Sequence, residues 1–392
     1  MDFNLTEEQL LVQETTRSFA TKELKPVASR LDREGIFPQE FVKQLGEMGL
    51  MGVFVPTEYG GASMDMISYV IALEEISKVW AALGTIMSVN NSLVCGALMR
   101  FGNEAQKKKY LEPLAKGEWL GCYSLTEANS GSDAGAMQSQ AQRDGGDYVL
   151  NGSKVFTTNG SRADLALVYA LTEPAQSKQG ISAFLIETKS PGFNVGRLED
   201  KLGLRSSDTA ALTFEDCRVP ESNRLGAEGE GFKIALATLD GGRIGIAAQA
   251  VGIAQGCLEE ATSYVCERRQ FGKPLSEFGA IQQMHADLAT EVDAARALTY
   301  RAAWLYAQGR NVTRAAAMAK LYASETCNRS AYKAVQIFGG YGYTKEFPVE
   351  RFYRDARVTT LYEGTSEIQR LIIARSLIAE GESFRGSQEK SV

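Results

Sequence analysis

A single glutamate stands between a bulky aromatic residue and a glycine in the segment TTLYEGTSEIQR, residues 359–370. Glu363 could be a solvated turn residue, or it could precede a helix whose N-cap is Thr365 or Ser366. Alternatively, its carboxylate could act as a general base, with Gly364 allowing a ligand to approach the backbone closely. The segment by itself leaves these alternatives open.

Other residue types that carry acid–base or metal chemistry are scarce. His285 is the single histidine and lies in the helical pattern IQQMHADLATEV. A histidine metal cluster is therefore excluded, and a Ser-His-Asp or Cys-His pair is not expected. None of the six cysteines belongs to a C-x-x-C pair, which indicates reduced, cytosolic-type usage. Acid–base chemistry must come from a carboxylate, a lysine, a tyrosine or a cofactor.

The composition is that of an acidic globular protein. The chain has 392 residues, of which 44% are apolar and 23% charged, with a net charge of −6 and a pI near 5.3. A nucleic-acid-binding protein would show a basic excess, so that class is not expected. No apolar run approaches the length expected of a membrane span, and the first residues do not resemble a signal peptide. These features predict a cytoplasmic protein of bacterial type, or a mitochondrial matrix protein if the chain is a processed eukaryotic one.

The spacing of apolar residues changes twice along the chain. Apolar residues recur at helical spacing in the first third, as in LTEEQLLVQETTRSFATKEL, and again in the last part. Between them, short alternating runs separated by Asp, Gly, Asn and Pro predict an antiparallel β-domain. The expected architecture is α+β, with a helical domain at 1–118, a β-domain at 119–225, a second helical domain at 226–384 and a tail at 385–392.

Glycine-rich segments give no nucleotide fingerprint. The chain lacks G-x-x-x-x-G-K-[ST], and GAEGEGFK follows no predicted parallel strand. The glycines of QIFGGYGYTKEF end a helical run. They could form a C-cap and turn, or they could bring the backbone against a flat or charged ligand.

Three segments, in order and properly spaced, resemble the acyl-CoA dehydrogenase family. They are YSLTEANSGSDAGA at 123–136, QIFGGYGYTKEFPVERFYRDA at 336–356 and YEGTSE at 362–367. The helix–β–helix order agrees, so the resemblance covers nearly the whole chain. It implies a helical N-terminal domain, a middle antiparallel β-domain and a C-terminal four-helix-bundle domain. The segment GGRIGIAAQ most resembles short-chain and short/branched-chain members.

The resemblance also implies an activity. Family members remove the α and β hydrogens of an acyl-CoA thioester to give the trans-2-enoyl-CoA. FAD accepts the hydride at N5, and the electrons then pass to electron-transfer flavoprotein. In this family Glu363 would be the base that takes the α-proton. The resemblance further implies a homotetramer arranged as a dimer of dimers, because parts of each FAD site match contacts made across subunits.

Cofactor-binding positions carry over in four groups. One lines the isoalloxazine and pyrophosphate, a second is a strand flanking the ring, a third reaches FAD commonly from a neighbouring subunit, and a fourth touches the far end of the flavin. These groups are, in order, Tyr123, Leu125, Thr126 and Ser132; Phe156, Thr157 and Thr158; Arg268, Phe271, Gln336, Gly339 and Gly340; and Thr365 and Glu367. The family often has a glutamine where this chain has Gly279, so Gln282 or Gln283 would have to supply an adenosine-side contact.

Substrate-binding positions are also implied by the resemblance; they are Ser132, Asp240, Arg243, Tyr362 and Gly364. Asp240 and Arg243 lie one helical turn apart, so an intrahelical ion pair is the alternative interpretation. Some members take their base from the position matching Gly242, which has no side chain to accept a proton. The stretch 81–94 contains no basic residue, which favours a neutral acyl chain because an unpaired buried carboxylate would be costly.

Rival functions remain on the same fold. An acyl-CoA oxidase would pass electrons to oxygen, and fast reoxidation of the reduced flavin in air would reveal it. A flavin-dependent monooxygenase would need no glutamate at position 363. A non-catalytic helical assembly protein would purify colourless, so a visible spectrum distinguishes it from the enzymes.

Overall fold

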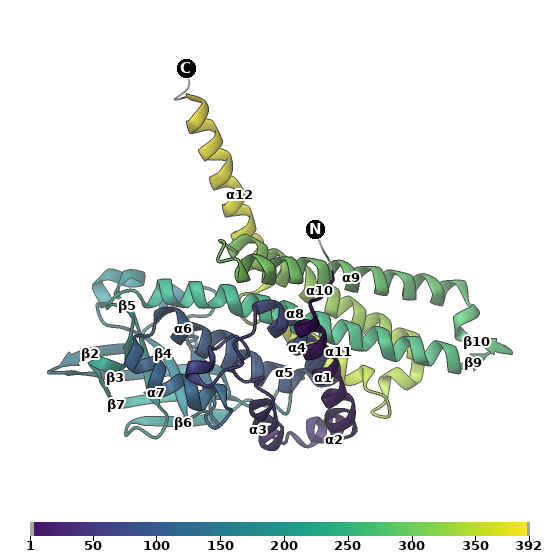
Figure 1. Ribbon diagram of the computed structural model, residues 1–392, viewed down its shortest axis with the longest axis horizontal. Helices are drawn as coiled ribbons and strands as arrows, with labels where there is room; N and C mark the ends of the chain where they lie inside the picture. Colours follow the sequence, from purple (N-terminus) through teal and green to yellow (C-terminus); the bar gives the residue numbers. More distant parts are fainter. Residues whose placement is uncertain (1–3, 390–392) are drawn as a thin grey trace.

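The computed structural model describes residues 4–389 and places a β-sheet between two helical regions of the chain (Figure 1). The first region includes π-helical turns at Ala20–Leu24 and Val89–Cys95. Its α-helices are α1 Glu7–Phe19, α2 Lys25–Glu34, α3 Gln39–Glu47, α4 Met66–Val79, α5 Ala81–Ser88, α6 Gly96–Phe101 and α7 Glu104–Ala115.

Local capping residues start several of these helices. At α1, the Thr6 hydroxyl accepts a hydrogen bond from the Gln9 backbone N–H (3.2 Å), and the Gln9 side chain accepts one from the Thr6 N–H (3.1 Å). Asn103 and Gln106 form the same reciprocal capping box at α7. Each box satisfies two backbone donors that the first turn would otherwise leave unpaired.

The middle of the chain forms an eight-stranded sheet with the order β6-β7-β3-β2-β4-β5-β8, and β1 pairs with β4 beside this path. The sheet is mixed rather than purely antiparallel, because β1 runs parallel to β4 and β2 makes one parallel bridge to β4. A strand that enters from a helical domain is not joined to its neighbour by a hairpin, so its direction is free. The strands are β1 Gly121–Ser124, β2 Gln140–Asp144, β3 Asp147–Thr158, β4 Leu165–Leu171, β5 Ile181–Glu187, β6 Phe193–Leu198, β7 Thr209–Pro220 and β8 Arg224–Leu225.

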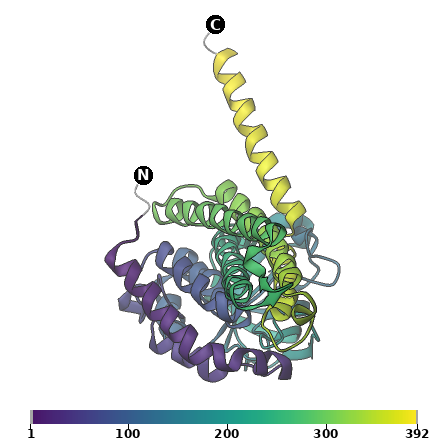
Figure 2. The ribbon, with the colours of Figure 1, turned by 90° about the vertical axis from the view of Figure 1, so that its right-hand side faces the viewer.

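Long helices form the last part of the chain. They are α8 Gly231–Glu267, α9 Gly279–Ala307, α10 Thr313–Phe338, α11 Val349–Ala356 and α12 Ser366–Glu389, with a small hairpin of β9 Arg269–Gln270 and β10 Lys273–Pro274 after α8. Helices α8, α9 and α10 pack side by side, and α8 also packs against α4. Helix α12 forms ion pairs with α10 and then projects from the body (Figures 1 and 2).

The proposed domain limits fall at or within these elements. The limit at 118/119 lies between α7 and β1, and that at 225/226 follows β8. The limit at 384/385 falls inside α12, and residues 390–392 of the expected tail lie outside the described residues.

The expectation about apolar runs requires a correction. The helical stretch Ala81–Phe101 is long and apolar enough, by length and composition, to cross a membrane. Its most apolar window is 89% buried inside the protein. Core helices of large domains are apolar all round because protein covers every face, and this burial places the stretch in the core.

Candidate active site

Glu363 lies in a two-residue turn immediately before α12. Both residues of the turn have positive φ, 53° at Glu363 and 94° at Gly364. Such a φ is uncommon for a residue with a side chain and suits glycine. The Thr365 hydroxyl accepts a hydrogen bond from the Ile368 backbone N–H (3.4 Å), so this residue caps the helix. A helix start and an inward-directed glutamate therefore occur together in this segment.

The Glu363 carboxylate is directed into protein rather than into solvent. Its Oε2 atom is buried and has no hydrogen-bond partner among the described residues. Burial raises the pKa of Glu363 to about 7, while the positive charges of Lys320 and Arg243 act in the opposite direction. A carboxylate with a pKa near neutrality is suited to accept a proton at physiological pH. The interpretation of Glu363 as a solvated turn residue is wrong for this structure.

Helix α8 passes directly beside this carboxylate. A Cβ atom built on Gly242 would collide with Glu363 Oε2 and would lie 2.7 Å from Leu93 Cδ2. The glycine therefore leaves the room that the Glu363 side chain occupies. The position implied by the resemblance for an alternative base thus adjoins Glu363 in space.

Asp240 and Arg243 form the intrahelical ion pair that their spacing allowed, at 2.7 Å. The Thr313 hydroxyl also donates to Asp240 Oδ2 at 2.7 Å. Arg243 is almost fully buried, and its Nε has no hydrogen-bond partner within residues 4–389. The pair lies close enough to Glu363 for the guanidinium charge to lower the carboxylate pKa. These two side chains therefore belong to the same site as Glu363.

A chain of hydrogen bonds joins the Glu363 turn to α8 and α5. The Tyr362 hydroxyl donates to Gln249 Oε1. The Gln249 amide then donates to the Ala81 carbonyl (2.8 Å) and to the Thr85 hydroxyl (2.6 Å). Because all of these groups are buried or half-buried, these hydrogen bonds hold the side chains in place and form a wall beside the turn.

The sheet presents a second set of expected residues on β1 and β3. Thr157 is buried and its hydroxyl bonds to that of Ser124 (3.0 Å). Phe156 is 64% exposed and has φ 58°. The other expected residues here are half-buried; they are Tyr123 on β1, Leu125 and Thr126 directly after it, and Thr158 on β3. Ser132 lies on the exposed loop after β1.

A buried ion pair supports this set of residues. Lys154 is fully buried and bonds to Glu127 Oε1 (2.8 Å) and to the Leu125 carbonyl (3.1 Å). Glu127 in turn accepts from the backbone N–H groups of Gln138 (2.6 Å) and Ser139 (3.0 Å). The loop after β1 is therefore tied to β3 through a satisfied buried network.

The residues on β1 and β3 fit a flat, polar-edged ring such as an isoalloxazine. Phe156 offers an aromatic face, and the hydroxyl of Tyr123 is buried without a hydrogen-bond partner in the part of the chain that the structure describes. Backbone and hydroxyl groups beside an apolar face satisfy the heteroatoms of such a ring without adding bulk.

The cofactor residues expected to reach FAD from a neighbouring subunit lie far from Glu363. Arg268 directly follows the end of α8, about 40 Å beyond Gly242 at the rise of an α-helix. Its guanidinium lies over the Tyr341 ring (5.3 Å), and Phe271 in the following hairpin is 94% exposed. Gln336, Gly339 and Gly340 are exposed at the end of α10. Figure 1 shows the β9–β10 hairpin at the end of the molecule opposite the sheet.

Three further expected positions lie near the starts of α9 and α12. Gly279 begins α9, and a Cβ there would meet no described atom within 4 Å. Gln282 donates to the Ser276 carbonyl (2.9 Å), so its amide has a partner within the chain. Glu367 is exposed in the first turn of α12.

Two buried polar residues of the site were not singled out from the sequence. Lys320 lies on the alanine-rich buried face of α10, and Gln249 interrupts the apolar run IAAQAVGIA of α8. A lone polar residue on an apolar helix face is the signal that could have identified them, because burial of such a group requires a partner. Among the described residues, no group of three His, Cys, Asp or Glu could hold a metal ion.

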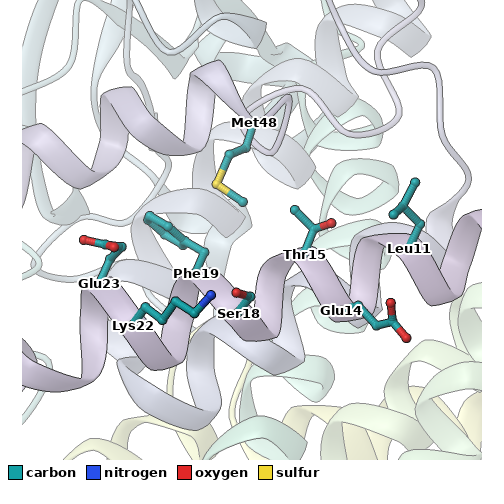
Figure 3. Close-up of a pocket in the computed structure, with 8 residues that line it drawn as sticks. All are labelled: Leu11, Glu14, Thr15, Ser18, Phe19, Lys22, Glu23 and Met48. Carbon is teal, nitrogen blue, oxygen red and sulfur yellow. The ribbon is translucent and has the colours of Figure 1, made fainter.

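A hollow lies between Met48 and the side chains of α1 and the turn that follows it (Figure 3). It contains none of the expected cofactor or substrate residues. Its lining consists of Leu11, Glu14, Thr15, Ser18, Phe19, Lys22, Glu23 and Met48.

The fold and the site together define a flavoprotein oxidoreductase scaffold, and the comparisons identify its family. The N-terminal, middle and C-terminal domains of acyl-CoA dehydrogenase match residues 6–118, 122–217 and 229–378. The chain belongs to the acyl-CoA dehydrogenase family. Its members depend on FAD, so FAD is the cofactor and an acyl-CoA is the substrate.

Individual relatives cover nearly the full chain. A short-chain specific acyl-CoA dehydrogenase of Clostridium acetobutylicum is 51% identical over 374 residues, covering 95% of this chain and 99% of the relative. The structure of butyryl-CoA dehydrogenase from Megasphaera elsdenii matches with a TM-score of 0.95 and 44% identity, covering 96% and 100% of the two chains. A chain from a structure described as an electron transferring flavoprotein of Acidaminococcus fermentans matches with a TM-score of 0.95 and 49% identity, covering 96% and 99%.

Proposed function

We propose that this enzyme dehydrogenates a short-chain acyl-CoA, straight or 2-methyl-branched, to the trans-2-enoyl-CoA, with Glu363 as the base that takes the α-proton. The observation that carries the proposal is the Glu363 Oε2 atom, which is buried without a partner among residues 4–389 and belongs to a carboxyl group whose pKa is raised to about 7. A solvated glutamate would be a much weaker base, with a pKa near ~4.3.

Different residues of this chain are proposed to bind the flavin and to remove the α-proton. Bound FAD accepts the two electrons removed from the substrate. Tyr123, Leu125, Thr126 and the residues around Phe156 hold its ring system, and Lys154 keeps the supporting loop in place. Glu363 removes the α-proton, and its own backbone N–H is proposed to donate to the thioester oxygen, where negative charge develops.

The wall of hydrogen bonds beside Glu363 favours a short acyl chain. Tyr362, Gln249 and Thr85 close the space between the turn, α8 and α5, and each is held by another buried polar group. A longer acyl group in this space would break these hydrogen bonds and leave buried polar groups unsatisfied. Residues 81–94 are buried and contain no basic side chain, so a neutral acyl group fits better than a dicarboxylic one.

The remote FAD-binding residues support an oligomer. Arg268 lies about 40 Å along α8 from Gly242, and the Gln336–Gly340 loop begins about 24 Å along α10 from Lys320, which bonds to the Glu363 turn. Both would therefore complete the FAD site of another subunit. Helix α12 projects from the body and exposes Leu371, Leu377 and Ile378, which a partner could cover (Figure 2). We propose a homotetramer arranged as a dimer of dimers, which light scattering would test.

Electron-transfer flavoprotein is the proposed electron acceptor. The support is the highly similar chain from the Acidaminococcus fermentans structure, which is described as an electron transferring flavoprotein. An oxidase would instead reduce oxygen, and stopped-flow reoxidation in air separates the two. The compartment proposed is the cytoplasm, or the mitochondrial matrix for a processed eukaryotic chain; all six cysteines are free thiols, as a reducing compartment allows.

Anaerobic bleaching of the flavin by butyryl-CoA tests the proposed function. The wild-type protein should purify yellow and lose its visible absorbance when the acyl-CoA is added. Glu363→Gln should keep the flavin and bind the acyl-CoA but reduce the flavin about 10²–10⁴-fold more slowly, since a positioned general base contributes that much. Flavin reduction by Glu363→Gln at the wild-type rate would falsify the assignment of the base.

A further inference from the structure

Lys320 is a fully buried cation next to the Glu363 turn. Its side chain has no exposed surface, and its ammonium group donates to the Gly364 carbonyl at 2.9 Å. Within the described residues it forms no direct ion pair with a carboxylate. A buried ammonium group is costly unless nearby groups compensate it, so its location requires an explanation.

The first part of the explanation is the strained backbone of the turn. Glu363 and Gly364 both have positive φ, and such a conformation persists only where the surroundings hold it. Lys320 and the Gln369 amide both donate to the Gly364 carbonyl, each at 2.9 Å, and Gln369 is also 3.3 Å from the Glu363 carbonyl. These donors fix the orientation from which the Glu363 side chain departs.

The second part is the balance of charge around the carboxylate. The titratable groups that face Glu363 are Tyr69 from α4, Tyr123 from β1, Arg243 with Asp240 from α8, Lys320 from α10 and Tyr362 from its own loop. Two of these groups are cations. The Arg243 charge is largely offset by its ion pair with Asp240, whereas Lys320 has no such partner among the described residues.

Lys320 remains mostly charged at neutral pH. Burial lowers its pKa to about 8, while the Glu363 carboxylate acts to raise it and Arg243 to lower it. Glu325 and Glu367 also face it. Glu325 bonds to Arg370 at 2.6 Å, and Glu367 is exposed to solvent, so neither offsets the charge as a buried partner would.

We propose that Lys320 is a positioning residue for Glu363: its ammonium group clamps the Gly364 carbonyl and supplies the uncompensated positive charge beside the carboxylate. The inference rests on the proposed function, in which Glu363 is the base. It assigns a role to a buried cation of α10 whose printed hydrogen bond, within residues 4–389, goes to the Glu363 turn rather than to the sheet residues of the flavin site or to the Asp240–Arg243 pair.

The experiment compares FAD-loaded variants of Lys320 over a range of pH. Lys320→Met removes both the charge and the donor, and Lys320→Gln removes the charge but keeps an amide donor. Lys333→Met is the matched control, because Lys333 lies on the same helix and pairs with Glu291 (3.0 Å) instead. Anaerobic flavin reduction by butyryl-CoA gives the pH profile. Infrared titration of the carboxyl band that is lost in Glu363→Gln reports the same proton without catalysis.

The sign of the expected shift follows from the charge. Removing a cation disfavours the carboxylate form, so the rising limb of the profile and the infrared titration should both move to higher pH by about one unit in the two Lys320 variants. At low pH this shift alone makes flavin reduction about tenfold slower. At high pH, Lys320→Gln should be faster than Lys320→Met because its donor still holds the turn. Lys333→Met should match the wild type.

Each other outcome identifies what failed. An unchanged pH profile and infrared titration in Lys320→Met overturns the inference, provided that Glu363→Gln has lost flavin reduction. Wild-type flavin reduction in Glu363→Gln overturns the proposed function itself. Should Lys320→Met not retain FAD, Lys320→Gln carries the same test of the charge, and an unshifted titration there is equally decisive.

Discussion

Adding one methyl group at Gly242 should disable this enzyme without unfolding it. The new Cβ would collide with Glu363 Oε2 and would lie 2.7 Å from Leu93 Cδ2. Both contacted atoms are the ends of side chains, so the collision is relieved by rotating them rather than by moving the backbone. Rotation of Leu93 is cheap, but rotation of Glu363 displaces the proposed base.

The expected magnitudes separate catalysis from stability. Replacing glycine by alanine inside a helix stabilises it by about 1 kcal/mol, which offsets much of the about 1–3 kcal/mol that overpacking costs. The melting temperature should therefore change little. Displacing a catalytic group by about 1 Å can slow a reaction about 10²-fold, and we expect a loss of that order in flavin reduction.

The assay is anaerobic stopped-flow reduction of the flavin by butyryl-CoA, with flavin content and thermal unfolding measured on the same preparations. Gly241→Ala is the matched control, because the nearest described atoms to its Cβ belong to the Tyr306 side chain at an ordinary 3.7 Å. That variant should keep the wild-type rate. A Gly242→Ala protein that reduces its flavin at the wild-type rate would refute the reasoning, and so would a loss explained by released flavin.

Three further variants probe the same site. Folding raises the pKa of Glu363 from 4.5 to about 7, so this group stabilises the wild-type fold at low pH and that stabilisation is lost as the carboxyl ionises. The free energy of unfolding of Glu363→Gln should therefore rise relative to that of the wild type by up to about 3 kcal/mol between about pH 5 and about pH 8.5. Thermal unfolding at both pH values measures this difference. Gly242→Glu in a Glu363→Gly background should recover part of the flavin reduction lost in Glu363→Gly alone, because the two positions adjoin in space; stopped-flow rates with no recovery would contradict this. Lys154→Met should release FAD more readily, since breaking a buried pair costs about 3–5 kcal/mol and leaves the charge of Glu127 uncompensated. Flavin fluorescence on dilution measures the release, and unchanged retention would count against the supporting role of the pair.

Local sequence determined the elements of this protein. Thr6 and Gln9 stand at the spacing of a capping box, and α1 begins there with both hydrogen bonds formed. Alternating runs bounded by turn residues predicted the strands of the sheet. The three motifs indicated the acyl-CoA dehydrogenase fold and its FAD cofactor, and both are confirmed by the comparisons. These features depend on neighbouring residues or on motifs that can be read in one dimension.

Tertiary structure alone decided how the site is assembled. The parallel pairing of β1 with β4 was not predicted, because strand direction depends on how the chain returns to the sheet. The clamp on the turn joins Lys320 to the Gly364 carbonyl across 44 positions of sequence. The environment of Glu363 likewise comes from α8 and α10, which the segment YEGTSE does not contain. A carboxylate's pKa is set by the atoms that replace water around it, and only the folded chain determines which atoms those are.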